Sequence, residues 1–231
     1  MTTTLITGGN KGLGHETARR LVELGHTVYI GARDETKGRA AADQIGAHLL
    51  VMDVTDDASV AAAAALLAAH ENKLDVLINN AGVFDAMVKA EDATAEDMRA
   101  VYDVNVFGIV RTTHAFLPML QASNDPAVIN VASGLGSFGI VTDPERFEAQ
   151  WAVPVYASSK AAVAMLTVQY AKALPGIRIN AADPGPTATD FTDNQAAQTV
   201  EEGTDAIVRL ATTGPGSPTG TYTDRFGEIP W

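Results

Sequence analysis

The chain has 231 residues, of which 46% are hydrophobic and 19% are charged, and its formal net charge at pH 7 is −12. This length suits one α/β domain spanning residues 1–231. The acidic balance and the scattered basic residues argue against nucleic acids and anionic membranes as partners.

The chain contains no cysteine. Disulfides, thiolate metal ligands and cysteine nucleophiles are therefore excluded, and no metal site is expected. The most apolar run, Val60 to Ala69, is about half the length of a membrane span. A strand that begins near residue 2 leaves no room for a signal peptide, so the expected compartment is the cytoplasm.

The first fourteen residues carry the clearest local pattern. The run Thr2 to Ile6 predicts a buried strand, a glycine-rich turn follows from Thr7 to Gly14, and an amphipathic helix is expected from His15 to Leu24. Glycines at 8, 12 and 14 permit a tight turn, close approach of the backbone to a pyrophosphate and close packing of helix on strand. The N–H groups that open the helix then face the phosphate.

Strands and helices alternate along the remainder of the chain. Further strands are expected at 27–31, 48–52, 74–78, 127–132, 176–182 and 220–223. Helices are expected at 35–45, 55–70, 95–117, 156–174 and 200–212, with Thr55 as an N-cap and Pro118 kinking or ending its helix. Residues 84–94 are expected to be loop or irregular helix, and 139–154 an exposed loop with one helical turn. This alternation predicts a parallel sheet covered on both faces.

The end of the second predicted strand bears on the choice of cofactor. In βαβ nucleotide folds an acidic side chain at this point binds the 2′-hydroxyl of the adenosine ribose, whereas an arginine accommodates a 2′-phosphate. Here Arg33 follows Ala32, and Lys11 supplies a second cation from the glycine turn. The two cations predict NADP(H) in preference to NAD(H). Asp34 either opposes this preference or caps the next helix.

Tyr156 and Lys160 lie four residues apart at the start of a predicted helix, so their side chains share one face. An ammonium some 4 Å from a phenol contributes roughly 4 kcal/mol at an effective dielectric near 20. This is worth up to about three pKa units. The sequence therefore predicts a tyrosine whose lowered pKa suits acid–base work near pH 7.

Three motifs together resemble those of the short-chain dehydrogenase/reductase family: the Thr-Gly-x-x-x-Gly-x-Gly turn at 7–14, Asn-Asn-Ala-Gly at 79–82 and Tyr-x-x-x-Lys at 156–160. The resemblance covers essentially the whole chain. It is closest to carbonyl-reductase-like members through Asn10-Lys11, the 133–137 segment and the ending Ile229-Pro230-Trp231. It implies a single-domain Rossmann fold, a doubly wound parallel sheet of about seven strands with helices on both faces.

The resemblance also implies a catalytic tetrad of Ser133, Tyr156, Lys160 and Asn105. In it, Ser133 polarises a carbonyl, Tyr156 is the acid or base, and Asn105 anchors a water that links Lys160 to solvent. Ser137 is a less favoured substitute for Ser133. The implied cofactor-binding residues are Gly8, Asn10, Lys11, Gly12, Leu13, Gly14, Arg33, Asp53, Val54, Asn80, Ala81, Gly82, Tyr156, Lys160, Pro184, Gly185, Thr187 and Thr189.

The implied function is NADPH-dependent reduction of a ketone or aldehyde to an alcohol, or the reverse reaction. The alternatives are a ketoreductase acting on carrier-bound acyl chains and a non-catalytic NADP-binding regulator. The expected partner is a small carbonyl or alcohol substrate. Aromatic residues near the expected substrate mouth favour an apolar or cyclic substrate, although each side chain is equally suited to packing in the core. These residues are Phe84, Phe138, Trp151 and Phe191.

The interval from Ser133 to Tyr156 is longer than is usual in the family. Monomeric carbonyl reductases carry a longer insertion here, which covers the surface that other members use for association. The intermediate length leaves a monomer, a dimer and a tetramer all open, and places residues 143–154 at the substrate mouth.

Overall fold

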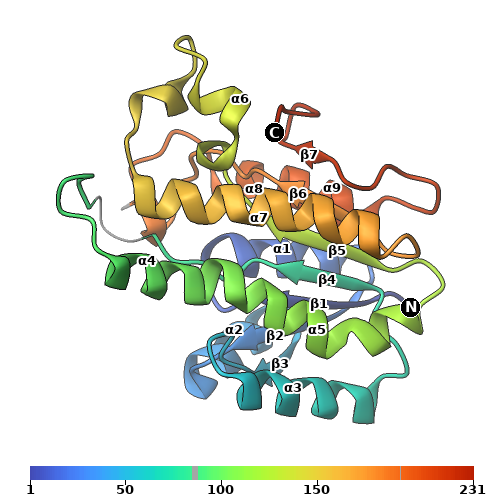
Figure 1. Cartoon of the computed structure of the whole chain (residues 1–231). Helices are drawn as coiled ribbons and strands as arrows, with labels where there is room; N and C mark the ends of the chain where they lie inside the picture. Colours follow the sequence, from blue (N-terminus) through green and yellow to red (C-terminus); the bar gives the residue numbers. More distant parts are fainter. Residues whose placement is uncertain (85–87, 193) are drawn as a thin grey trace.

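The computed structural model describes residues 1–84, 88–192 and 194–231, so part of the expected 84–94 loop lies outside the described residues. Seven parallel strands form one sheet in the order β3-β2-β1-β4-β5-β6-β7 (Figure 1). Their bounds are β1 Thr3–Thr7, β2 Thr27–Ala32, β3 His48–Val51, β4 Val76–Asn79, β5 Ala127–Val131, β6 Arg178–Ala182 and β7 Tyr222–Thr223. The predicted doubly wound parallel sheet is confirmed.

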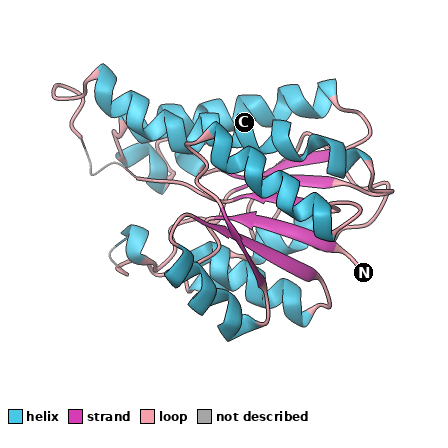
Figure 2. Ribbon diagram, turned by 90° about the horizontal axis from the view of Figure 1, so that it is seen from below, coloured by secondary structure: helices cyan, strands magenta, loops and turns pink. Residues whose placement is uncertain are grey.

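Helices cover both faces of this sheet (Figure 2). The α-helices are α1 Gly12–Glu23, α2 Glu35–Ile45, α3 Asp57–His70, α4 Ala95–Tyr102, α5 Gly108–Gln121, α6 Phe138–Val141, α7 Pro154–Ala173, α8 Val200–Gly203 and α9 Asp205–Thr212. Helices α1, α2 and α9 contribute to the core on one face, and α3, α5 and α7 to the core on the other. Among the helices of the described ranges, none is long and apolar enough to cross a membrane.

Alternation along the strands builds the two cores. Successive side chains of a strand point to opposite faces of a sheet. Ile6 accordingly packs with Ile30 in the core under α1, whereas its neighbour Leu5 packs in the core under α3 and α5. All five residues of β1 are buried, which is typical of a parallel strand covered on both sides.

Side-chain caps set the start of two helices. The Asp34 carboxylate accepts a hydrogen bond from the Lys37 N–H at 3.0 Å, so its role as the N-cap of α2 is confirmed. The N-cap of α3 is Asp56, which accepts from the Ala58 N–H at 2.8 Å, and the prediction of Thr55 is wrong by one residue. Thr55 instead donates its hydroxyl to Asp53.

The helix expected at 95–117 is divided by a π-helical segment, Asp103–Phe107, and then continues to Gln121, within one turn of Pro118. The wider turn is centred on Asn105 and redirects that side chain, a common use of π-helical segments at functional sites. The 139–154 region also differs from prediction. It begins within α6 and contains the 3₁₀ turn Phe147–Gln150, so it has two helical segments where one was expected.

Buried amides and hydroxyls connect the central strands to α5 and α7. The Asn79 amide donates to Asn130 Oδ1 at 2.9 Å, and its oxygen accepts from the Thr112 hydroxyl at 2.7 Å. Asn130 in turn donates to Thr167 on α7 at 2.9 Å. This network satisfies polar groups inside an otherwise apolar core, and it orients the carboxyl end of β4.

We expect Asn79→Ala to lower the free energy of unfolding by about 1–3 kcal/mol, because Asn130 Oδ1 would lose its donor inside the core. Urea unfolding followed by circular dichroism measures this loss. The exposed Asn124→Ala variant is the control and should stay within about 0.5 kcal/mol of the wild type. Equal stabilities for the two variants would contradict a structural role for the network.

Candidate active site

The glycine turn and the Asn-Asn-Ala-Gly segment are bonded to each other at the carboxyl edge of the sheet. The Asn80 amide donates to the carbonyls of Thr7 and Gly8 at 2.9 and 3.1 Å. The Thr7 hydroxyl accepts from the N–H groups of Asn80 and Ala81 at 3.0 and 2.9 Å. The expectation that the amides of this motif bridge neighbouring strands is therefore confirmed.

Two glycines of the turn are required by their surroundings. Gly8 has φ +65°, and a side chain there would approach the Ala81 backbone to 3.0 Å. A Cβ on Gly14 would lie 2.5 Å from both the Gly8 oxygen and the Asn80 amide nitrogen. Neither position accommodates a side chain without displacing backbone.

The N-terminus of α1 has the properties of an anion site. Within the described ranges no side chain caps it, and its first turn contains no acidic residue. The N–H groups of Gly12, Leu13 and Gly14 precede the first complete turn and have no intrahelical acceptor. These donors, together with the helix dipole, fit a pyrophosphate. Asn10 lies in the same turn, two residues before the helix.

The two cations proposed for a 2′-phosphate lie in different surroundings. The Lys11 ammonium forms an ion pair with Asp190 at 3.0 Å, and both side chains are exposed. Arg33 is exposed at the end of β2. Its charge reaches Asp53: burial raises the pKa of that carboxyl, but hydrogen bonds from Thr55 and the positive charges of Arg33 and Arg111 outweigh burial and lower it. Asp53 therefore carries a negative charge next to this cation.

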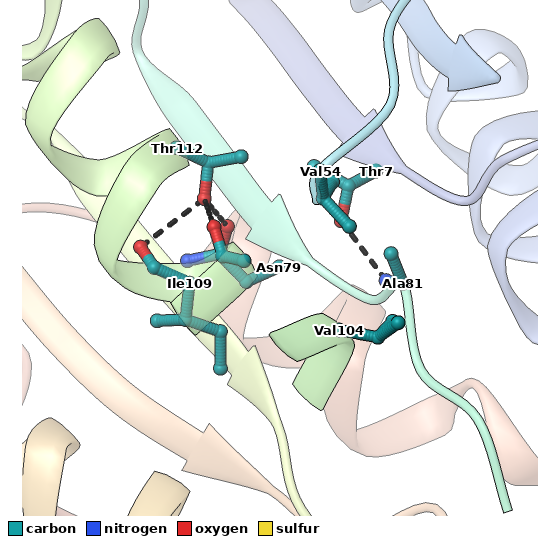
Figure 3. A pocket seen from close by; sticks show the side chains of 8 residues that line it. Thr7, Val54, Asn79, Ala81, Val104, Ile109 and Thr112 are labelled. Atoms are coloured by element: carbon teal, nitrogen blue, oxygen red, sulfur yellow. Dashed lines mark hydrogen bonds between the residues drawn. The ribbon is translucent and has the colours of Figure 1, made fainter. Parts of the chain in front are cut away.

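A narrow pocket lies between the end of β4, the loop after β3 and helix α5 (Figure 3). Val54 and Ala81 line it together with Val104 of the π-helical segment, and the Thr7–Ala81 hydrogen bond closes one side. The structure thus brings Val54 and Ala81, two residues of the predicted cofactor site from separate loops, into the lining of one pocket.

The loop after β6 faces the glycine turn. A Cβ on Gly12 would lie 3.6 Å from the Thr189 methyl group. Thr187 is buried, its hydroxyl donates to the carbonyls of Pro184 and Gly185, and Gln198 donates to that hydroxyl at 3.2 Å. Hydrogen bonds from side chains of this loop thus hold its backbone in place, and the loop lies beside the predicted phosphate site.

Tyr156 and Lys160 are both buried on α7. The Lys160 ammonium donates to the Val131 carbonyl at 2.8 Å and lies 5.7 Å from the centroid of the Tyr156 ring. A Cβ on Gly82 would lie 3.7 Å from the same nitrogen. The Asn-Ala-Gly segment, the end of β5 and the Tyr–Lys pair thus converge.

The pKa of Tyr156 differs from the expectation. Burial raises it well above the ordinary value of 10, a hydrogen bond from Ser133 opposes the rise and the charge of Asp183 adds to it. Burial also lowers the pKa of Lys160 to about 8, against the opposing charge of Asp183. The prediction that Lys160 lowers the pKa of the phenol is wrong for this structure, because desolvation dominates and the ammonium bonds Val131.

Ser133 joins the pair from the end of β5. Its hydroxyl hydrogen-bonds the Tyr156 phenol and accepts from the Leu135 N–H at 3.3 Å. Ser137, the less favoured substitute, is fully buried, and its hydroxyl donates to the Pro230 carbonyl at 2.6 Å while accepting from Ile140. Of the two serines, only Ser133 is in contact with the tyrosine among the interactions described.

Asn105 is 1% exposed and has all its polar atoms engaged. Its side-chain oxygen accepts a hydrogen bond from the Val83 N–H at 2.8 Å. Its side-chain nitrogen donates to the Val83 carbonyl at 3.0 Å and to the Ser159 hydroxyl at 3.1 Å. These bonds hold the π-helical segment against the segment after β4 and against α7. A Cβ on Gly82 would lie 3.4 Å from its side-chain oxygen, close to Lys160.

Two residues of this site were not singled out from the sequence. Asp183 is buried, and its carboxylate accepts from the N–H groups of Gly185 and Gly134, so it connects the loop after β6 to the serine segment. Burial raises its pKa against those hydrogen bonds, with Glu148 and Asp224 adding to the rise. Tyr222 bonds the Ser133 backbone. The sequence did not indicate the role of Asp183, because a single acidic residue after a strand is not a recognisable motif.

The aromatic residues predicted near the substrate mouth lie in different surroundings. Phe84 packs edge-to-face on Tyr156 with ring centroids 4.8 Å apart. Phe138 and Trp151 are exposed, at 72% and 40% of their surface, on the 137–155 segment. The side chain of Phe191 lies outside what the structure describes. Of these aromatic residues, Phe84 is the one with a described contact to the tyrosine.

The doubly wound parallel sheet carries a glycine turn, an uncapped helix N-terminus and a Ser–Tyr–Lys cluster at its carboxyl edge, with Tyr156 and Lys160 buried and Ser133 partly exposed. These features define a dinucleotide-dependent oxidoreductase type of site. The family model for short chain dehydrogenases matches residues 2–200. The chain therefore belongs to the short-chain dehydrogenase/reductase family of nicotinamide-dependent oxidoreductases.

Comparison with individual proteins supports this family assignment. Short-chain dehydrogenase anuI of Penicillium roqueforti is 38% identical, and the alignment covers 91% of this chain and 88% of that protein. The (-)-isopiperitenone reductase of Mentha piperita is 31% identical over 96% and 95% of the two chains. The solved NADPH-bound carbonyl reductase from chicken fatty liver is similar with a TM-score of 0.88 and 26% identity, covering 100% of this chain and 99% of that one.

The lowered pKa of Lys160 makes stability depend on pH. The folded protein releases this proton near pH 8, whereas the unfolded chain holds it up to about 10.5. The unfolded state binds more protons in between, so stability rises with pH across this window, by up to about 3 kcal/mol for the full shift. We expect wild type to gain stability relative to Lys160→Met between pH 8 and 10.5.

Chemical denaturation at pH 7.5 and pH 10 measures this gain. The exposed Lys172→Met variant on the same helix controls for the general loss of one positive charge. A wild-type-to-Lys160→Met difference that is the same at both pH values would contradict the assignment.

Proposed function

We propose that this protein reduces a small ketone or aldehyde to an alcohol with NADPH, using Tyr156, Ser133, Lys160 and Asn105. The observation that carries the proposal is the contact of the Ser133 hydroxyl with a buried, neutral Tyr156 phenol at the edge of the sheet that holds the glycine turn. The reductase and carbonyl reductase relatives support it.

The hydroxyls of Ser133 and Tyr156 would share the carbonyl oxygen of the substrate. Both are O–H donors, and oriented donors at a developing oxyanion stabilise the transition state far more in a buried site than in water. The chemistry that NADPH would supply when bound is a hydride for the carbonyl carbon. The Tyr156 phenol would then give its proton to the carbonyl oxygen as the C=O π electrons move onto it, and the product would be an alcohol.

The raised pKa of Tyr156 keeps the phenol protonated at neutral pH, which is the state that can donate a proton to a carbonyl oxygen. Lys160, with its pKa near 8, is close enough to neutrality to give up a proton and recover it. The Asn105 side chain joins the Val83 backbone to Ser159 of α7, and a water held near this lysine would return the proton from solvent.

Lys11 and Arg33 are the residues proposed to prefer NADP(H) over NAD(H). Support comes from the exposed guanidinium at the end of β2 and the cation within the glycine turn. The pyrophosphate and rings of the cofactor would be contacted by the remaining residues of the glycine turn and by three further segments, Asp53–Val54, Asn80–Gly82 and Pro184–Thr189. The Phe84 ring against Tyr156 supports an apolar or cyclic substrate.

We expect Tyr156→Phe to lower kcat by about 10²–10⁴-fold, because the site loses its proton donor, while NADPH binding stays within twofold. NADPH consumption with a panel of aldehydes, ketones and quinones measures turnover. Tyr170→Phe, on the same helix, is the matched control and should retain activity. Wild-type protein that consumes no NADPH with any member of the panel would contradict the proposed function.

Cofactor preference is tested by Arg33→Ala. Loss of a charge-assisted contact to a 2′-phosphate should weaken NADPH binding by about 10–100-fold, with NADH binding unchanged. Quenching of tryptophan fluorescence during titration gives both affinities. Arg39→Ala removes an exposed arginine on α2 as the control. Equal wild-type affinities for NADH and NADPH would refute the preference and leave the catalytic cluster standing.

A further inference from the structure

Tyr222 is a buried phenol outside the proposed tetrad, and its hydroxyl bonds only the backbone of Ser133 among the interactions described. It accepts from the Ser133 N–H at 3.1 Å and donates to the Ser133 carbonyl oxygen. The side chain is 1% exposed. Both hydrogen-bonding functions of one phenol are thus spent on the residue whose hydroxyl touches Tyr156.

The sheet makes this reach possible. Tyr222 lies on the edge strand β7 and pairs with Ala181 of β6, while Ser133 follows β5 on the far side of β6. The small side chain of Ala181 leaves room for the ring, which packs against Ala132 and Val163. The phenol therefore crosses one strand and ends at the serine.

The C-terminal residues hold the ring in this position. Trp231 packs on Tyr222 with ring centroids 5.2 Å apart, and the Ile229 N–H donates to the Tyr222 carbonyl at 2.9 Å. The same segment bonds the chain after Ser133, because the Trp231 carbonyl accepts from the Gly139 N–H at 2.9 Å. Figure 1 shows the C-terminus between β7 and α6.

Among the described interactions, Tyr222 is the partner of the Ser133 N–H and one of two partners of the Ser133 carbonyl. The Ser133 φ of −168° and ψ of 141° are extended, and the segment turns into a 3₁₀ helix at the next residue. Its carbonyl also accepts from the Gly136 N–H at 2.7 Å, but its N–H depends on Tyr222. Burial raises the pKa of Tyr222, so the phenol keeps the proton that it donates.

We propose that Tyr222 is a positioning residue: its phenol, steadied by Trp231, fixes the Ser133 backbone so that the serine hydroxyl stays on the reacting oxygen beside Tyr156. The proposal rests on the proposed carbonyl reduction. Tyr222 acts through Ser133 and touches neither substrate nor cofactor. Removing its hydroxyl should therefore slow the chemical step and leave cofactor binding intact.

The test is Tyr222→Phe in two backgrounds, wild type and Ser133→Ala. The phenylalanine keeps the ring and its packing on Trp231. We expect kcat to fall by about tenfold in the wild-type background with the KM for NADPH unchanged, and the isotope effect with deuterated NADPH to rise. In the Ser133→Ala background the same substitution should cost less than twofold, because the group being positioned is gone. Tyr29→Phe, which removes the phenol that bonds Glu71 elsewhere on the sheet, is the control.

Equal losses in the two backgrounds, or a loss matched by Tyr29→Phe, would overturn the proposal. Hydrogen exchange separates its failure from that of the proposed function. Tyr222→Phe should speed exchange of the Ser133 amide at least tenfold, with the α1 amides unchanged, whether or not a substrate has been found. Unchanged exchange at Ser133 would refute the positioning role, whereas absence of turnover in every variant would refute carbonyl reduction.

Discussion

The contact between the end of β4 and the glycine turn is the constraint on which the site depends. Four hydrogen bonds join the two segments: the Asn80 amide donates to the carbonyls of Thr7 and Gly8, and the Thr7 hydroxyl accepts from the N–H groups of Asn80 and Ala81. This contact fixes the direction of the chain through Gly82, which lies beside Lys160 and Asn105. The glycine turn and the cluster of Tyr156, Lys160 and Asn105 are thereby held in fixed positions relative to each other at this edge of the sheet.

Burial sets the ionisation of the residues proposed for catalysis. Tyr156, Lys160 and Asp183 are ionisable groups removed from water, and a buried charge is costly unless it is paired or hydrogen-bonded. The lysine bonds a main-chain carbonyl and the aspartate bonds two main-chain amides. Desolvation moves the pKa of the phenol upward and that of the amine downward, toward neutrality. A protonated phenol next to an easily deprotonated amine is an arrangement suited to delivering protons.

Several features could be predicted because they depend on short stretches of chain. Alternating apolar strands and periodic helices gave the parallel sheet, and the glycine spacing located the uncapped end of α1. The errors arise where the pattern within one segment does not decide the outcome. Asp56 and Thr55 are adjacent capping residues, and only the backbone path decides that Asp56 caps while Thr55 bonds Asp53. The π-helical segment around Asn105 follows from bonds to Val83 and Ser159, which are distant in sequence.

The sequence by itself determined the order of the elements and the position of the glycine turn, since each depends on residue type and spacing within one segment, and it supplied the candidates for the tetrad through the resemblance to a family. The tertiary structure decided which groups meet: Asp183 with the serine segment, Tyr222 with Ser133 and Lys11 with Asp190. It also reversed the expected shift of the Tyr156 pKa. Spacing along a helix gives the distance between two side chains, but the cost of burying a charge depends on everything packed around it.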